Sequence, residues 1–217
     1  MKLFIWDLHG TLEQGNEIAA VEVSNKILES FGYSQRFDEL TGKKLYGLKW
    51  YEYYEYLLPD ETHERHIELQ EASFALSNSP EGATIIAKHI KPSLHALLIL
   101  GAIKLKHDQI VVSNTVPESL PFYLNVLGIT NYFGKNNALA VNQHSKEATR
   151  TKADVIKDYL IGKIYDEIIV IGDSEGDMLL ADQISAKAYL YAHGGTPFRS
   201  KKGHYKINDL SELLIEL

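Results

Sequence analysis

Five short apolar runs, each typical of a buried β-strand, alternate along this chain with stretches of helical periodicity. They cover residues 3–6, 109–112, 138–141, 167–171 and 188–192. This alternation predicts an α/β fold with a Rossmann-like, doubly wound parallel sheet. The segment between the first two runs is too long for a simple crossover and carries only helical patterns. We therefore predict an α/β core domain formed by residues 1–15 and 91–217, and an inserted α-helical domain formed by residues 16–90.

Helical spacing of apolar residues supplies the remaining predicted elements. In the insert we expect helices near residues 18–28, 37–45, 49–58, 62–76 and 83–89. In the core we expect them near residues 93–100, 117–127, 152–160, 178–184 and 211–217, with Pro117 in a first helical turn. The tyrosine-rich segment 49–58 could line a pocket or fill a small core. Adjacent Tyr53 and Tyr54 must face differently, so periodicity leaves both interpretations open.

Polar residues follow three of the predicted strands. Asp7 follows the first, Ser113 the second and Asp173 the fourth, with Asp177 four residues further on. Ligands of open parallel sheets bind beyond the carboxyl ends of the strands, so these side chains are expected to converge. Clustered carboxylates repel one another unless a cation joins them, and oxygen ligands suit Mg²⁺. The acids at 173–177 could alternatively serve only as a helix N-cap, which would not explain Asp7.

Composition limits the classes of binding partner to expect and indicates a cellular compartment. The 217-residue chain has a formal net charge of −7, and it has no strongly basic stretch. Nucleic acid and anionic membranes are therefore not expected partners, and a phosphorylated small molecule must meet positive charge locally. The chain has no cysteine, which excludes disulfides and thiolate metal sites. Its apolar runs, including residues 94–102, are too short for a signal peptide or a membrane helix, so a cytoplasmic protein is expected.

Four motifs in order resemble those of the haloacid dehalogenase superfamily of phosphotransferases. The first, Asp-x-Asp-Gly-Thr, appears as Asp7-Leu8-His9-Gly10-Thr11, and the second is a strand that ends at Ser113-Asn114. The third, a lysine that opens a helix, is matched by Lys152, and the fourth appears as Gly172-Asp173 through Asp177. The inserted domain stands where that family carries its helical cap. The resemblance covers the whole chain and implies a hydrolase.

The resemblance also implies a role for each motif residue. Asp7 would attack phosphorus and form an aspartyl-phosphate that water then hydrolyses. Mg²⁺ would be held by Asp7, the backbone carbonyl of His9, Asp173 and Asp177. Ser113 and Asn114 would bind the phosphoryl group, and Lys152 would balance its charge. The expected protein is thus a Mg²⁺-dependent phosphatase that acts on a small phosphorylated metabolite.

His9 is the departure from the family pattern, because the usual residue there is a second aspartate that acts as general acid and base. Histidine can transfer the same proton. Alternatively, His9 marks a weak enzyme or a non-catalytic protein that binds phosphate or metal. Phosphonoacetaldehyde hydrolases of the superfamily also lack this aspartate and use a cap lysine for Schiff-base chemistry. Lys49 lies near the corresponding place, so a carbon–phosphorus hydrolase is a further alternative. The preferred interpretation is that residues 47–49 form the substrate-specificity loop of the cap, where Lys49 would contact the substrate. The sequence identifies neither the substrate nor the oligomeric state.

Overall fold

The computed structural model describes residues 1–134, 136–142, 150–194 and 196–217. It divides into two compact units. The core unit comprises Met1–Gln14 and Lys91–Leu217, and the helical unit comprises Gly15–Ile90. The first division falls between Gln14 and Gly15, one residue earlier than the predicted boundary.

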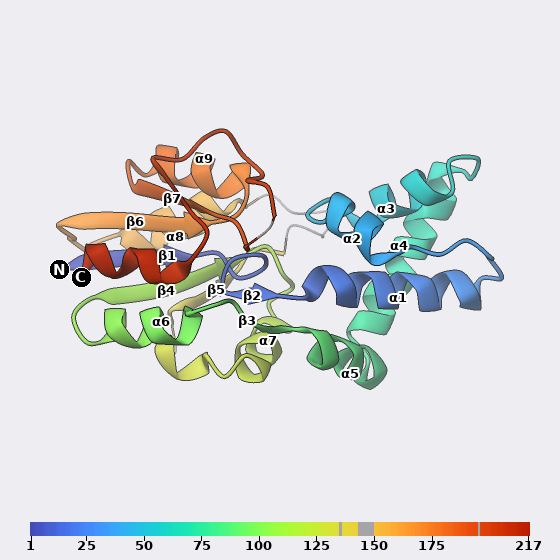
Figure 1. Cartoon of the computed structure of the whole chain (residues 1–217), viewed down its shortest axis with the longest axis horizontal. Helices are drawn as coiled ribbons and strands as arrows, with labels where there is room; N and C mark the ends of the chain where they lie inside the picture. Colours follow the sequence, from blue (N-terminus) through green and yellow to red (C-terminus); the bar gives the residue numbers. More distant parts are fainter. Residues whose placement is uncertain (135, 143–149, 195) are drawn as a thin grey trace. The chain divides into compact units, whose positions relative to one another are not determined.

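A six-stranded parallel sheet forms the centre of the core unit, in the order β5-β4-β1-β6-β7-β8 (Figure 1). The fold class predicted from the sequence is confirmed. The edge strand β8 was not predicted, because two of its three residues are exposed and leave no apolar run. The strands are β1 (Lys2–Trp6), β4 (Asp108–Ser113), β5 (Ala138–Ala140), β6 (Glu167–Gly172), β7 (Lys187–Tyr191) and β8 (Tyr205–Ile207).

Helices cover both faces of this sheet (Figure 1). Alternate strand residues such as Leu3, Ile5 and Val170 pack with Ile156 and Met178 of α8 and α9 on one face. The helices are α6 (Ala96–Lys104), α7 (Leu120–Val126), α8 (Lys152–Leu160) and α9 (Glu175–Gln183), with 3₁₀ helices η1 (Thr130–Tyr132) and η2 (Leu210–Glu216).

One sequence prediction about these helices was wrong in detail. Helix α7 begins at Leu120, so Pro117 precedes it, and Pro121 occupies the first turn instead. The error concerns the end of an element, where local hydrogen bonding decides the outcome. The short helix predicted at the C-terminus is present as the 3₁₀ helix η2.

The strand order places a topological switch point in the middle of the sheet. Strand β1 pairs in parallel with β4 on one side and with β6 on the other. From β4 the chain continues outward to β5, whereas from β6 it continues outward to β7 and β8. Connections that diverge from neighbouring strands leave a crevice at their carboxyl ends, which is the usual ligand position in such sheets.

A short antiparallel ribbon marks the place where the chain leaves the core unit and returns to it. It pairs β2 (Glu13–Gln14) with β3 (Lys91–Pro92). Strands of two residues carry no recognisable periodicity, and the sequence did not predict them. The pairing holds Glu13 against the core unit and fixes the chain directly after the first motif.

Five helices form the helical unit, and an apolar core with contributions from Leu28, Tyr54 and Leu69 joins them. Tyr53 and Tyr54 are both buried in this core, so these two tyrosines have a packing role. The Tyr54 hydroxyl also lies 2.6 Å from the Ser73 hydroxyl. The helices are α1 (Asn16–Ser30), α2 (Glu39–Leu45), α3 (Trp50–Leu57), α4 (His63–Ser77) and α5 (Pro80–His89).

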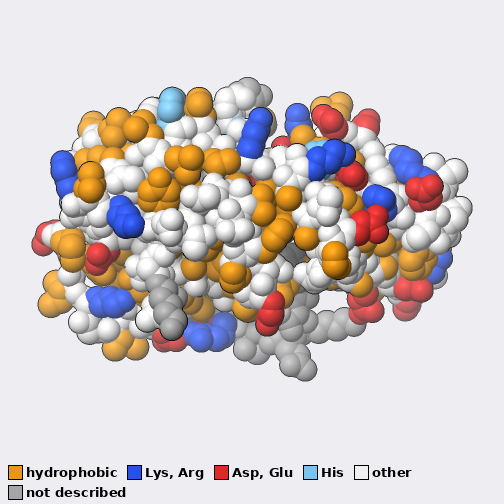
Figure 2. Space-filling model, turned by 90° about the horizontal axis from the view of Figure 1, so that it is seen from below, with side chains coloured by type: hydrophobic (Ala, Val, Ile, Leu, Met, Phe, Trp, Pro, Cys, Tyr) orange, Lys and Arg blue, Asp and Glu red, His pale blue; other side chains and the backbone are white. Residues whose placement is uncertain are grey.

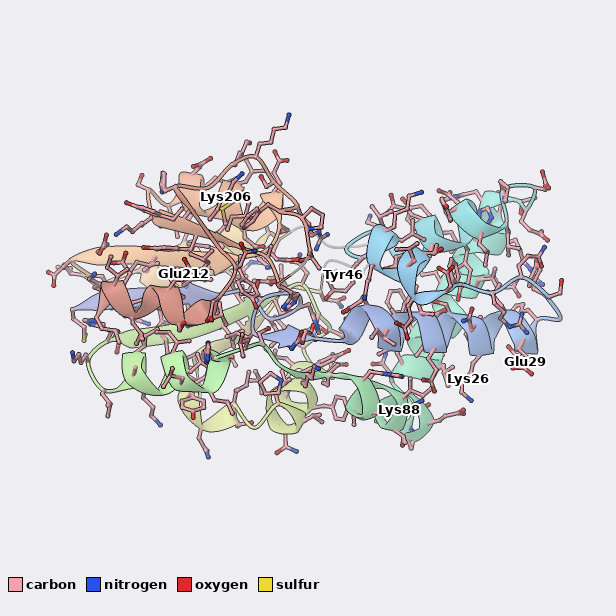
Figure 3. The ribbon with its side chains drawn as sticks, in the orientation of Figure 1. Lys26, Glu29, Tyr46, Lys88, Lys206 and Glu212 are labelled. Carbon is pink, nitrogen blue, oxygen red and sulfur yellow. The ribbon has the colours of Figure 1, made fainter. Side chains whose placement is uncertain are left out.

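Ion pairs link α1 to α5 at the surface of the helical unit. Lys26 lies 2.8 Å from Glu81, and Lys88 lies 2.9 Å from Glu22; both lysines are labelled in Figure 3. Exposed pairs of this kind contribute little to stability, because water screens them. Burial of apolar side chains is therefore the main source of this unit's stability.

Surface charge and helix length agree with an ordinary globular chain. On the face shown in Figure 2, lysine and arginine side chains are scattered and do not gather into a patch. Within the described ranges, each helix is too short or too polar to cross a membrane.

Candidate active site

Asp7 stands directly after β1, at the carboxyl edge of the sheet. Its backbone N–H donates to the carbonyl of Ile171 at 2.9 Å, which extends the β1–β6 pairing by one residue. The side chain is 8% exposed, and the Thr11 hydroxyl lies 3.5 Å from its Oδ2. The chain then turns at Gly10, whose φ is +81°. A Cβ at that position would lie 2.4 Å from Oδ2 of Asp173, so glycine permits the two acidic turns to approach.

The second acidic turn joins β6 to α9. Ser174 caps α9, and its side chain and the Asp177 side chain form a capping box. The Ser174 hydroxyl donates to Asp177 Oδ2 at 2.6 Å, while Oδ1 of the same carboxylate accepts from Lys152. Asp177 therefore has a capping role and a role in the site at once. Gly172 is needed here as well, because a Cβ would lie 2.3 Å from the Asp177 side chain.

Lys152 brings positive charge to the two acidic turns. It is the first residue of α8, and the capping box of Thr151 and Asp154 sets the start of that helix. Its Nζ donates to Oδ1 of Asp7 at 2.5 Å and to Oδ1 of Asp177 at 2.8 Å. Burial favours the neutral amine, but the two carboxylates outweigh burial and raise the pKa of Lys152. The ammonium is thus held between nearly buried carboxylates.

Three buried carboxylates converge at this edge of the sheet. Asp7, Asp173 and Asp177 each offer an oxygen, and these atoms all lie within 4.8 Å of one another. Burial raises the pKa of Asp7 to about 7; Lys152 opposes this shift, and the other two acids add to it. Burial likewise raises the pKa of Asp173 to about 6, against the effect of a neighbouring arginine. Such crowding favours a bound cation, and an all-oxygen donor set fits Mg²⁺.

That arginine, Arg199, was missed by the sequence analysis. It lies between β7 and β8, and its Nη1 donates to Oδ2 of Asp173 at 2.6 Å. It adds a second cationic group to the acidic site. No sequence signal marks Arg199, because it follows no strand and lies in an irregular segment.

His9 lies beside Glu13, an acidic residue that the sequence analysis also missed. The His9 Nδ1 lies 3.0 Å from Glu13 Oε1, and the backbone N–H of Gly10 donates to the same oxygen at 3.3 Å. Glu13 is fully buried. The His9 ring meets Tyr123 edge-on, with centroids 4.7 Å apart. The available sequence signal was an acid four residues after the histidine, just beyond the first motif.

The remaining predicted site residues fall in two places. Ser113 ends β4, next to β1, and is buried, with its Oγ accepting from the backbone N–H of Thr115 at 3.2 Å. Asn114 follows it and is exposed. Lys49 belongs to the helical unit, where its N–H donates to Glu52 as α3 begins. The structure thus brings Asp7, Lys152 and the two acids after β6 into contact, and it places Ser113 and Asn114 on the adjacent strand end.

Comparisons with solved structures reproduce this architecture. A haloacid dehalogenase-like family hydrolase from Streptococcus pneumoniae superposes with a TM-score of 0.73 at 17% identity, over 99% of this chain and 97% of that one. A predicted phosphoglycolate phosphatase from Haemophilus somnus gives 0.74 at 17% identity, over 99% and 96%. A predicted phosphatase from Clostridium acetobutylicum gives 0.70 at 19% identity, over 100% and 99%. At these identities the likeness establishes the fold.

The structure defines an α/β protein with three clustered carboxylates at the carboxyl edge of a parallel sheet. A family model described as haloacid dehalogenase-like hydrolase matches residues 1–184. The chain belongs to this family, and the resemblance seen in its motifs is confirmed at that level. No curated protein matches the chain.

Proposed function

We propose that this protein is a Mg²⁺-dependent phosphatase that acts on a small phosphorylated metabolite through an aspartyl-phosphate at Asp7. The observation that carries the proposal is the contact of Lys152 with both Asp7 and Asp177 inside a buried cluster of three carboxylates. A phosphate ester brings negative charge to this site. Opposing positive charge must therefore come from Lys152 and from a cation on the carboxylates.

The chemistry assigned to Asp7 is nucleophilic attack. One carboxylate oxygen forms a bond to phosphorus as the ester P–O bond breaks, and the leaving oxygen takes a proton. Water then attacks phosphorus, gives up a proton and releases phosphate, which regenerates Asp7. Lys152 orients the nucleophile through its 2.5 Å contact with Oδ1 and offsets charge in both steps.

The acidic donors fit a divalent ion. We propose that the carboxylates of Asp7, Asp173 and Asp177 hold Mg²⁺ together with the backbone carbonyl of His9. When bound, the ion offsets repulsion between the nucleophile and the phosphate. Ser113 and Asn114, at the end of the strand beside β1, are proposed to donate to phosphoryl oxygens.

His9 is proposed to serve as the general acid in the first step and the general base in the second. General acid–base catalysis of this kind typically raises the rate by a factor on the order of 10² to 10⁴. Two structural neighbours described as predicted phosphatases add to the case for phosphate esters as substrates.

Phosphate release from a panel of phosphate esters, with and without Mg²⁺, tests the proposal. We expect turnover that requires Mg²⁺, and we expect Asp7→Asn to abolish it with the fold intact. Asp182→Asn is the matched control, since Asp182 is exposed on α9 and should be replaceable without effect. Wild-type rates in Asp7→Asn would remove Asp7 as the nucleophile. Borohydride trapping with phosphonoacetaldehyde forms the second arm, and an adduct lost in Lys49→Ala would replace ester hydrolysis by carbon–phosphorus cleavage.

A further inference from the structure

A buried carboxylate directly after the first motif has a partner that explains its position. Glu13 has no exposed surface, and a buried acid is costly unless it is bonded. Its Oε1 lies 3.0 Å from His9 Nδ1. The β2–β3 ribbon fixes the backbone at Glu13 through pairing with Pro92, so the carboxylate is held in place from its own strand.

The hydrogen bonds at Oε1 determine which nitrogen of His9 carries the proton. The backbone N–H of Gly10 also donates to Oε1, at 3.3 Å, and a backbone N–H can only donate. A carboxylate oxygen can only accept, so with Glu13 as a carboxylate the His9 Nδ1 that faces Oε1 is the donor. The proton of the neutral ring is thereby assigned to Nδ1, and Nε2, across the ring, keeps its lone pair.

The ring of His9 is also restrained from the side. Tyr123 on α7 meets it edge-on, with the two ring planes at 84°. Tyr123 is itself buried, and burial together with the charge of Glu13 raises its pKa. The His9 side chain keeps 21% exposure, so part of the ring is accessible while Nδ1 is engaged.

We propose that Glu13 is a positioning residue for His9, and that this Glu–His pair performs the proton transfers assigned to His9. The inference rests on the proposed function, since it concerns how His9 would serve that reaction. In it, Nε2 of the doubly protonated ring gives its proton to the leaving oxygen, and the lone pair left on Nε2 then takes one from the attacking water, which restores the starting ring. Glu13 holds Nδ1–H throughout and is not itself consumed. His9 thus has a dedicated partner and is not a chance replacement of the usual aspartate.

Nitrogen NMR of ¹⁵N-histidine-labelled protein tests the arrangement without any turnover. We expect the neutral His9 ring to carry its proton on Nδ1, and we expect Glu13→Ala to abolish that preference. Glu55→Gln is the matched control, because Glu55 Oε1 also lies 3.0 Å from a histidine Nδ1, that of His63 in the helical unit. It should leave the His9 signals unchanged. A proton on Nε2 in the wild type, or His9 signals unaffected by Glu13→Ala, would overturn the inference.

Kinetics supply the second readout. We expect Glu13→Ala to slow the turnover of alkyl phosphates tenfold or more, which is within the range of rate enhancement by general acid–base catalysis. The turnover of aryl phosphates should slow less. In a His9→Ala background the same change should have no further effect, because the two residues act as a unit. Additive losses would overturn the inference.

Glu13→Gln guards against misfolding, since it keeps an acceptor of the same size. It should retain the Nδ1 proton and an intermediate rate, and a loss as large as that of Glu13→Ala would count against positioning. The two proposals can fail separately. A wild type with the expected tautomer but no phosphatase activity refutes the proposed function alone, whereas an active enzyme with the Nε2 tautomer refutes only the role of Glu13.

Discussion

Replacement of His9 by aspartate tests the environment of the first motif most directly. From the motif alone, His9→Asp would restore the family pattern and preserve activity. The structure reverses that expectation, because Glu13 is fully buried and faces the histidine at 3.0 Å. The substitution removes a hydrogen-bond donor and places a second carboxylate opposite the first.

The size of the penalty follows from the distance. An aspartate is shorter than a histidine, so the two carboxylates would lie farther apart than the 3.0 Å between His9 Nδ1 and Glu13 Oε1. At an effective dielectric constant of about 20, two like charges about 5 Å apart repel by about 3 kcal/mol. Repulsion also raises the pKa of the introduced aspartate above its value in the unfolded chain. The destabilisation is therefore full well above pH 5 and is relieved as the pH falls and one carboxyl takes up a proton.

Urea denaturation followed by circular dichroism measures this effect. His9→Asn is the matched control, since it has the size of aspartate without its charge. At pH 8 we expect His9→Asp to unfold with a free energy about 3 kcal/mol lower than that of His9→Asn, and the gap should narrow at pH 5. Adding Glu13→Val to His9→Asp should close the gap and raise phosphatase activity above that of the single variant. Equal stabilities of His9→Asp and His9→Asn at pH 8 would refute the reasoning.

Two further predictions concern the groups around Asp7. Gly10→Ala and Gly162→Ala both force alanine into a positive φ, at a cost of about 1–2 kcal/mol. Of the two, the new Cβ meets another group only at Gly10, where it would lie 2.4 Å from Asp173 Oδ2. Thermal melts and Mg²⁺ titrations should therefore show a larger loss of stability and a weakened Mg²⁺ response for Gly10→Ala alone; equal effects would contradict the close approach. Lys152→Met should lower kcat by roughly 10²–10³, as for loss of one preorganised donor, whereas Lys157→Met, at an exposed position on the same helix, should not. Similar kcat values for the two lysine variants would exclude a role for Lys152 in charge balance.

Much of the core unit was predictable because its signals are local. A strand buried on both faces is a continuous apolar run, and such a run precedes Asp7, Ser113 and Asp173. Parallel strands share one carboxyl edge, so residues that follow them in sequence meet in space. Lys152 was predictable on weaker grounds, as the residue that opens a helix in a motif of the family.

The pairing of Glu13 with His9 and that of Arg199 with Asp173 were decided by the tertiary structure. Glu13 comes directly after Leu12 and begins the two-residue strand β2. Only the pairing of β2 with β3, and the packing around Glu13, bury its carboxylate. Arg199 reaches Asp173 across 26 residues of chain, and nothing in its local sequence marks that contact. The amino-acid sequence by itself determined the α/β class and the acidic strand ends, because period, burial and turn chemistry are encoded locally. Which charged side chains share a buried space depends on how distant segments pack, and only the folded structure supplies that information.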